Sequence, residues 1–260
     1  AQAAHNVVTG ARHHTFRQFG SGTFTGARTL YSSYALFDPL LFLEEVKALE
    51  GEGVTHPRTL FFVEEDCVIT TIFQQAMNRV REIVRGEGRH GSCGLGIGET
   101  QSDKEKSPDF VLTVSDITDE TKTFEKLEVI RKRKYSEALK ISEGVTSQLL
   151  VEELATLGNS EFSKAAQSAY SAILARIQVV SRQQALSMLR DAESPIFEGA
   201  QGILIDQNYG FYPYITRSDV TPSNAVRMCR DAGLLYEIMG VVRAYTVRHG
   251  PGPMPTFDKK

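Results

Sequence analysis

The sequence predicts an α/β protein with a central, mostly parallel sheet flanked by helices. Helix-type and strand-type patterns alternate through the first third of the chain, which is the order found in sheets covered by helices. The chain has 260 residues, 41% of them hydrophobic, enough to bury a sizeable core. We expect one domain spanning residues 1–260. Since the chain opens without an initiator Met, we also expect a fragment, incomplete at both ends.

The first half carries clear helix and strand signals. Asp38 is placed to cap a helix that begins at Pro39 and ends at Gly51, because an acidic cap followed by proline is typical of a helix start. Residues 59–63 then predict a strand, and residues 70–85 a second amphipathic helix. Residues 101–108 are polar and charged, so we expect a mobile linker there.

The second half is predicted to be mostly helical. We expect helices over residues 119–141, 146–157 and 160–190, the start of another over 224–230, and a strand over 241–248. The run Arg131–Lys134 lies within the first of these helices. We interpret it as a solvated face rather than a nucleic-acid patch, because no aromatic residues interleave with the charges.

Composition favours a small-molecule partner. The 29 basic and 32 acidic residues give a formal charge of −3, so nothing global draws the chain to nucleic acid or to an anionic membrane. The three cysteines lack CxxC spacing, which disfavours a disulfide framework and a zinc site. The adjacent His13 and His14 would point to opposite faces of a strand and cannot easily share a metal. Cysteines outside a disulfide framework indicate a reducing compartment, so we expect a cytoplasmic protein. No apolar run is long enough to cross a bilayer, and we expect neither a membrane nor a nucleic-acid partner.

The stretch from Pro195 to Asp206 is the first candidate site. Gly199 and Gly202 bracket Gln201, which predicts an extended segment ending in a turn at the edge of the sheet, where open α/β folds bind ligands. A carboxamide can both donate to and accept from a base edge or a phosphoryl oxygen. The alternative is a buried loop glutamine that satisfies backbone groups, and the spacing alone does not separate the two.

Residues 90–99 form the second candidate site. Their four glycines leave backbone amides free to form an anion-binding concavity, and Ser92 adds a hydroxyl, which suits a phosphate monoester. A simple flexible loop remains an open alternative. A nucleophile elbow is disfavoured because His90 stands where the motif has glycine. A dinucleotide fingerprint is disfavoured because a charged stretch precedes the glycines.

Three blocks, in this order, resemble the adenylosuccinate synthetase family. Residues 2–6, Gln-Ala-Ala-His-Asn, are similar to the family's Asn-Ala-Gly-His-Thr. Residues 92–98 are similar to its Thr-Thr-Gly-Arg-Gly-Ile-Gly. Residues 197–216 contain Phe-Glu-Gly-Ala-Gln-Gly, a following Asp206 and Tyr-Pro-Tyr-Ile-Thr, as the family does. The resemblance runs patchily over the whole chain and implies a fold related to P-loop NTPases.

The resemblance implies a carbon–nitrogen ligase of purine biosynthesis. Such enzymes join L-aspartate to the 6-oxo position of IMP, and they use GTP and Mg²⁺ and act as homodimers. The purine O6 is phosphorylated first, because phosphate leaves far more easily than an oxo group. The implied partners are a purine nucleoside monophosphate, a nucleoside triphosphate (GTP or ATP) and L-aspartate.

Carried onto this sequence, the family pattern assigns His5 as general acid and Gln201 as the contact to the activated O6. It places the substrate nucleotide on Gln2, Asn6, Ser92, Cys93, Gly94, Ile205 and Thr216, and a metal-binding carbonyl at Ala4. The sequence departs from the family at Ala4, Asn6, Cys93 and Leu95, which replace Gly, Thr, Thr and Arg. The family's general-base loop and its aspartate-binding loop have no counterpart in these residues, so we expect the chain alone to be inactive.

Two alternatives to this function stay open. Residues 18–22 and 211–222, with the altered glycine segment, look similar to the viral branch of the family, which uses dGMP and commonly ATP to make N6-succino-2-amino-2′-deoxyadenylate. The other alternative is a non-catalytic remnant that only binds purine nucleotides, favoured by the missing Arg and Thr.

Overall fold

The computed structural model describes residues 4–10, 12–242, 244–245, 247–248 and 250–255. Within these residues the strands form three small sheets. The parallel sheet has the order β3 (Thr29–Tyr31), β5 (Phe61–Glu64), β7 (Gln178–Val180). β4 (Leu36–Phe37) pairs in parallel with β6 (Val68–Ile69), and β1 (His5–Thr9) pairs antiparallel with β2 (Arg12–Phe16). The predicted α/β class with parallel strands is confirmed.

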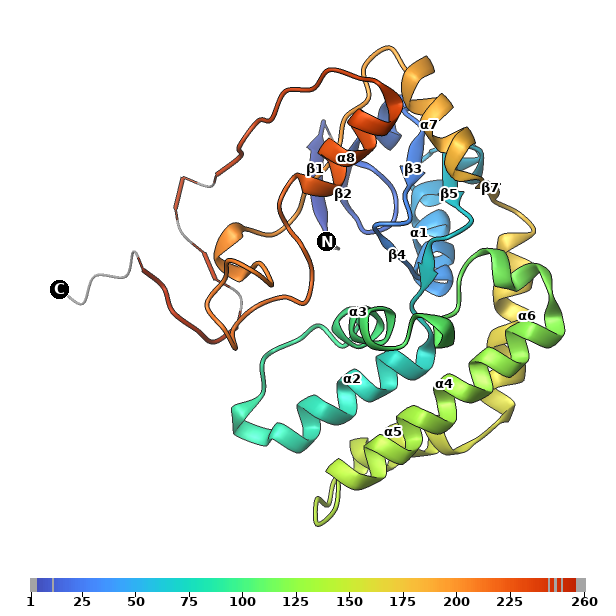
Figure 1. Ribbon diagram of the computed structural model, residues 1–260, viewed down its shortest axis with the longest axis vertical. Helices are drawn as coiled ribbons and strands as arrows, with labels where there is room; N and C mark the ends of the chain where they lie inside the picture. The colour runs from blue at the N-terminus through green and yellow to red at the C-terminus, as the bar shows by residue number, and fades with distance from the viewer. Residues whose placement is uncertain (1–3, 11, 243, 246, 249, 256–260) are drawn as a thin grey trace.

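Helices cover the strands and also form a layer of their own (Figure 1). Their bounds are α1 (Pro39–Gly51), α2 (Ile72–Arg85), α3 (Ile97–Lys106), α4 (Glu120–Ile141), α5 (Gln148–Gly158), α6 (Glu161–Leu174), α7 (Arg182–Asp191) and α8 (Ser223–Ala232). In Figure 1 α2, α4 and α5 lie below the strands, and α7 and α8 lie in the upper half of the molecule. Among the described residues, none of these helices is both long and apolar enough to pass through a membrane.

The local signals for α1 are confirmed. The carboxylate of Asp38 accepts hydrogen bonds from the amides of Leu40 and Leu41 at 3.0 and 3.1 Å, Pro39 is the first helical residue, and the helix ends at Gly51. This cap satisfies amides that have no partner within the helix. Asp119 caps α4 in the same way, so both helices begin where the sequence predicts them.

An aromatic cluster joins α1 to the sheets. The ring of Phe61 on β5 lies 4.6 Å from that of Phe42 on α1, 5.0 Å from that of Phe19 and 5.7 Å from that of Phe37 on β4. All four rings are buried. Burying a side chain of this size contributes about 1.5–3 kcal/mol, so the cluster fixes α1 and the strands as one body.

The predicted linker over 101–108 is wrong, because α3 covers most of it. Lys134 of α4, only 5% exposed, places its ammonium group 2.7 Å from the carboxylate of Asp103 and 3.2 Å from that of Glu99. These ion pairs dock a polar helix that has little apolar surface. The solvated interpretation of the basic run is therefore also wrong for Arg131 and Lys134, both of which are buried.

Two further predictions fail in the second half. β7 interrupts the helix predicted over 160–190, which is split into α6 and α7. The described residues of 241–248 form no strand, and Val241 and Val242 are 88% and 91% exposed. A β-branched segment becomes a strand only where a neighbouring strand pairs with it, and the described residues offer this segment no such neighbour.

Candidate functional site

Residues 90–98, called here the glycine loop, lie against α2. Gly91, Gly94 and Gly96 have φ angles of 70°, 72° and 73°, in the left-handed region that favours glycine. A Cβ atom at Gly96 would lie 2.7 Å from the backbone nitrogen of Gln75. The loop therefore approaches the α2 backbone as closely as only glycine allows.

Two α2 side chains, one turn apart, hold the glycine loop. Asn78 donates from Nδ2 to Ser92 Oγ at 2.9 Å and accepts from the Gly96 amide at 3.3 Å. The Oε2 atom of Glu82 accepts from the amides of Gly91 and Ser92 at 2.8 and 3.2 Å. Sequence reasoning missed both side chains, although their i, i+4 spacing just before the loop was an available signal. The loop is held by specific bonds, and its amides bind an acidic oxygen.

Gln201 is exposed and lies in a turn with φ of 68°. Its Nε2 atom donates to Thr216 Oγ1 at 3.3 Å, and the Thr216 amide donates to the Ile205 carbonyl at 2.7 Å. The prediction that Gln201 ends an extended strand at a sheet edge is wrong, since residues 192–202 contain no strand and 203–205 form a short 3-10 turn. The alternative of a buried loop glutamine is wrong as well.

Asp206 organises the segment that carries Gln201 and Thr216. Its fully buried carboxylate accepts from the amides of Asn208 and Val220, both at 2.7 Å, and of Tyr209 at 3.1 Å. The segment from 203 to 220 is thus folded around one carboxylate.

Three segments that are far apart in sequence meet beside the glycine loop. A Cβ atom at Gly98 would lie 3.9 Å from Arg217 Cδ, and one at Gly250 would lie 2.9 Å from the His90 carbonyl oxygen. Arg248 donates from Nη2 to the Tyr214 carbonyl at 2.8 Å. The loop between α2 and α3, the segment around 201–217 and the segment around 248–252 accordingly lie together at the left of Figure 1.

The N-terminal candidates lie on or next to the β1–β2 hairpin. His5 is half-buried on β1, Ala4 precedes the strand and is exposed, and Gln2 lies outside the described residues. Asn6 Oδ1 accepts from Thr15 Oγ1 at 2.8 Å and contacts His13 Nε2 at 2.9 Å.

A bond from the turn after β2 joins the hairpin to the Gln201 segment. The Ser21 amide donates to both carboxylate oxygens of Glu198 at 3.2 Å, and the 3-10 turn containing Ser21 contacts β1. Within the described part of the chain, no hydrogen bond links His5 directly to Gln201 or to Ser92. His14 lies 3.5 Å from Glu45, whereas His13 faces Asn6, so the two adjacent histidines have different neighbours.

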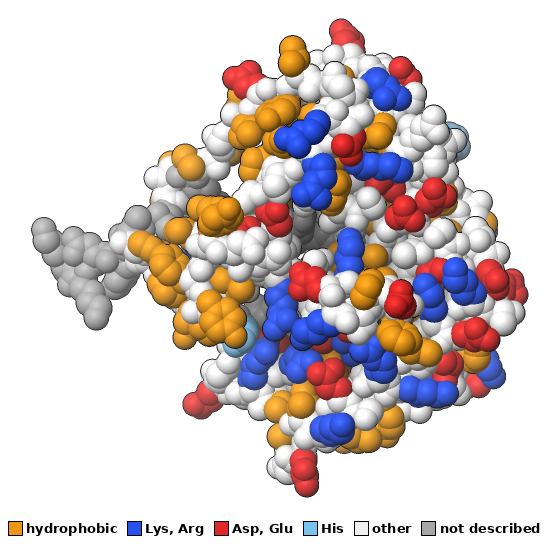
Figure 2. All heavy atoms as spheres, in the orientation of Figure 1, with side chains coloured by type: hydrophobic (Ala, Val, Ile, Leu, Met, Phe, Trp, Pro, Cys, Tyr) orange, Lys and Arg blue, Asp and Glu red, His pale blue; other side chains and the backbone are white. Residues whose placement is uncertain are grey.

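The basic side chains below the glycine loop are mostly paired. Figure 2 shows Lys and Arg gathered on this face over α2, α3 and α4. Arg81 forms ion pairs with Glu99 and Glu137. Burial raises the pKa of Glu99, but Lys134 and Arg81 outweigh it and hold that pKa below its usual value. These charges serve mainly to fix α3, and with it the end of the glycine loop.

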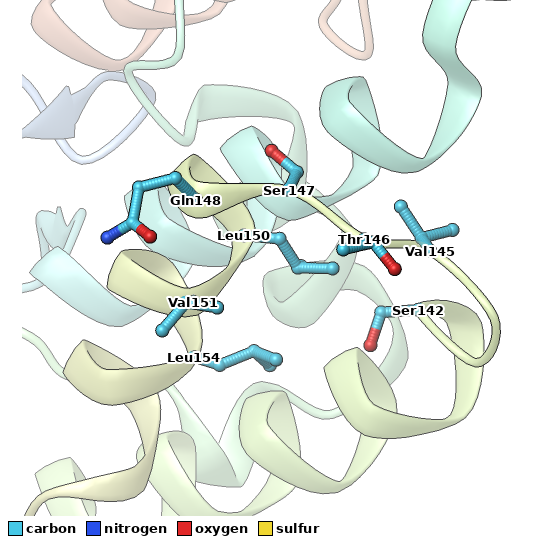
Figure 3. A pocket seen from close by; sticks show the side chains of 8 residues that line it. All are labelled: Ser142, Val145, Thr146, Ser147, Gln148, Leu150, Val151 and Leu154. Atoms are coloured by element: carbon cyan, nitrogen blue, oxygen red, sulfur yellow. The ribbon is translucent and has the colours of Figure 1, made fainter.

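Two cavities lie away from the candidate residues. One of about 280 Å³ lies between the end of α4 and α5 (Figure 3), lined by Ser142, Val145, Thr146, Ser147, Gln148, Leu150, Val151 and Leu154. The other, of about 180 Å³, lies between α1 and α6 and includes Leu43 and Ile173. Neither contains a residue that the sequence singled out as functional.

The arrangement defines a class of protein. Its glycine loop in an α/β fold has two successive amides that converge on the carboxylate of Glu82, and backbone concavities of this kind bind anions. All 260 residues match the family model described as adenylosuccinate synthetase, and the chain belongs to that family.

Known proteins agree with this assignment. Adenylosuccinate synthetase of Thermobifida fusca (strain YX) is 29% identical over 98% of this chain and 56% of its own length. The fully ligated adenylosuccinate synthetase of Plasmodium falciparum has a TM-score of 0.68 at 17% identity, covering 97% of this chain and 55% of that one. The cyanophage S-2L succinoaminodeoxyadenylate synthetase (PurZ), bound to dGMP and dATP, has a TM-score of 0.55 at 18% identity, covering 90% and 50%. The chain spans about half the length of the relatives it matches.

Proposed function

We propose that this chain is the nucleotide-holding part of a ligase that joins L-aspartate to the 6-oxo position of a purine nucleoside monophosphate, IMP in the first instance, through a 6-phosphoryl intermediate with GTP. Family membership supports the reaction class. One observation carries the proposal. Gln201 bonds to Thr216, and the next residue, Arg217, lies beside Gly98 at the end of the glycine loop. We also propose that the protein acts as a homodimer in the cytoplasm.

The glycine loop, Gln201 and His5 then have distinct roles. The amides and hydroxyl of the glycine loop hold the 5′-phosphate, and Gln201 exchanges its bond to Thr216 for one to the purine O6. His5 supplies a proton, as a protonated imidazole can. Arg217 makes no hydrogen bond or ion pair with a described residue and lies beside Gly98. Arg217 offers the phosphate a positive charge in place of the family's Arg, which Leu95 replaces here.

The described residues do not form a magnesium site by themselves. Ala4 offers only a backbone oxygen, and no group of three or more His, Cys, Asp or Glu side chains in the described part of the chain is arranged to hold an ion. Mg²⁺ in such enzymes usually takes one or two carboxylates together with substrate phosphates.

A second candidate uses dGMP and ATP and yields the succino-2-aminodeoxyadenylate. Its support is the sequence of residues 18–22 and 211–222, together with the altered glycine loop. The third candidate, nucleotide binding without catalysis, is supported by the absence of the family's Arg and Thr at Leu95 and Cys93.

Turnover by the full-length protein separates these candidates. We expect aspartate-dependent phosphate release with IMP and GTP, and release only with dGMP and ATP selects the second candidate.

Gln201→Ala is expected to lower kcat by about 10²-fold, whereas Gln207→Ala, six residues further on, leaves it unchanged. Purine nucleotide binding without release selects the remnant, and the absence of both refutes the proposal. Turnover by the 260 residues alone contradicts the expectation that they are inactive.

A further inference from the structure

We infer that Glu82 occupies the phosphate cradle of the glycine loop as an internal carboxylate, which the phosphate of the substrate displaces; this rests on the proposed function. One oxygen of Glu82 accepts from two successive amides, Gly91 at 2.8 Å and Ser92 at 3.2 Å. Successive amides converging on one oxygen are how a backbone concavity binds an anion. The site therefore takes a phosphate monoester, with Gly91 and Ser92 as its donors.

Glu82 is not the only side chain that holds the glycine loop. Asn78 holds it independently, through the Ser92 hydroxyl and the Gly96 amide. The close packing of Gly96 on α2 fixes the loop from the same side. The cradle can therefore persist once Glu82 has left it.

The released carboxylate also keeps a partner. The second oxygen of Glu82 accepts from Arg85 Nη1 at 2.6 Å, so displacement does not leave a charge unpaired. Burial raises the pKa of Glu82, but the Ser92 amide, Arg85 and the Gly91 amide outweigh it and lower that pKa. Glu82 is thus a charged competitor at neutral pH.

This competition makes Glu82 a specificity-determining residue. A dianionic phosphate brings more charge and more acceptor oxygens than one carboxylate, so it can take over the amides. A nucleoside or a weakly acidic ligand cannot do so, because its bonds to the amides would be weaker than those that Glu82 already makes. Every ligand of these amides meets the same cost of displacing Glu82, so only a ligand that binds them strongly, such as a phosphate monoester, is held.

The test measures inorganic phosphate, IMP and dGMP binding to the full-length protein by calorimetry. We expect inorganic phosphate to bind about tenfold more tightly to Glu82→Ala, equivalent to about 1.4 kcal/mol, and about threefold more tightly to Glu82→Gln. The matched control is Glu87→Gln, which makes the same charge change in the next turn, at an exposed residue that bonds to no described residue. It should change the affinity less than twofold.

Unchanged or weaker phosphate binding in both Glu82 variants overturns the inference, because Glu82 then only fastens the loop. Glu82→Gln keeps the side-chain volume and decides the question if Glu82→Ala does not fold. Tighter phosphate binding without binding of IMP or dGMP supports the inference and refutes the proposed function. If the nucleotides bind but neither Glu82 variant binds them or phosphate more tightly, the proposed function stands and the inference about Glu82 is overturned. Absence of any phosphate or nucleotide binding overturns both.

Discussion

Replacing Asp206 by alanine is expected to disorder the segment that presents Gln201. The Asp206 carboxylate is fully buried and accepts from the amides of Asn208, Tyr209 and Val220. Alanine removes all three acceptor interactions at once and brings no polar group in their place. The Gln201–Thr216 bond then loses the support of the loop in which Thr216 lies.

The magnitude follows from those three amides. A buried donor without a partner costs about 1–3 kcal/mol, but these amides are only part-buried and water restores some of their bonding. We expect Asp206→Ala to lower the free energy of unfolding by about 2–4 kcal/mol. Asp206→Asn keeps Oδ1 for Asn208 and Tyr209 but turns an NH₂ group towards the Val220 amide, so we expect about 1–2 kcal/mol.

Urea unfolding followed by circular dichroism measures the loss of unfolding free energy. Calorimetry with IMP and dGMP measures the effect on nucleotide affinity. If the loop opens locally, the loss shows in nucleotide affinity more than in global stability. The matched control is Asp66→Asn, at an exposed aspartate that bonds to no described residue, which should stay within about 0.5 kcal/mol. Wild-type stability and wild-type nucleotide affinity in Asp206→Ala would refute this account of the loop.

Three further predictions concern the elements around the site. Lys134→Met removes the cation beside Asp103 and should lower the free energy of unfolding by about 3 kcal/mol in urea; an unchanged midpoint contradicts the docking of α3 by ion pairs. Gly96→Ala should lower the melting temperature, since it combines a left-handed φ with a backbone clash at Gln75, and a wild-type melting curve contradicts that packing. Burial outweighs the Leu41 and Leu40 amides and raises the pKa of Asp38 to about 6, so the folded state holds this proton more tightly than the unfolded state. Wild-type stability should therefore fall by about 3 kcal/mol as pH rises from about 4 to about 6, and Asp38→Asn should lose that slope; an equal slope in both proteins contradicts the assignment.

Local signals in the sequence predicted the helix starts well. Asp38 with Pro39, and Asp119, lie at caps whose chemistry involves only neighbouring residues, so no tertiary information was needed. The helix α3 was missed because its stability comes from Lys134, which lies on another helix. β7 was missed because three residues between two helices give no periodic signal, and the strand exists only through its pairing with β5.

The candidate site was predictable as residues but not as geometry. The glycine pattern of 90–98 pointed to an anion site, and the bonds from Glu82 to its amides agree with that chemistry. The i, i+4 spacing of Asn78 and Glu82 was the one signal that α2 would hold the loop, and nothing in the sequence indicated that Arg217 would lie beside Gly98. Gln201 was expected at a sheet edge because Gly199 and Gly202 bracket it in a segment predicted to be extended, yet residues 192–202 form no strand and 203–205 form a 3-10 turn.

A crystal structure of the full-length protein with IMP, and in parallel with dGMP, shows which groups hold the phosphate and the purine. We expect the phosphate on the amides of Gly91 and Ser92 with Glu82 displaced, and the purine O6 about 3 Å from Gln201 Nε2. A nucleotide bound elsewhere, or one whose phosphate lies away from the glycine loop, contradicts this expectation.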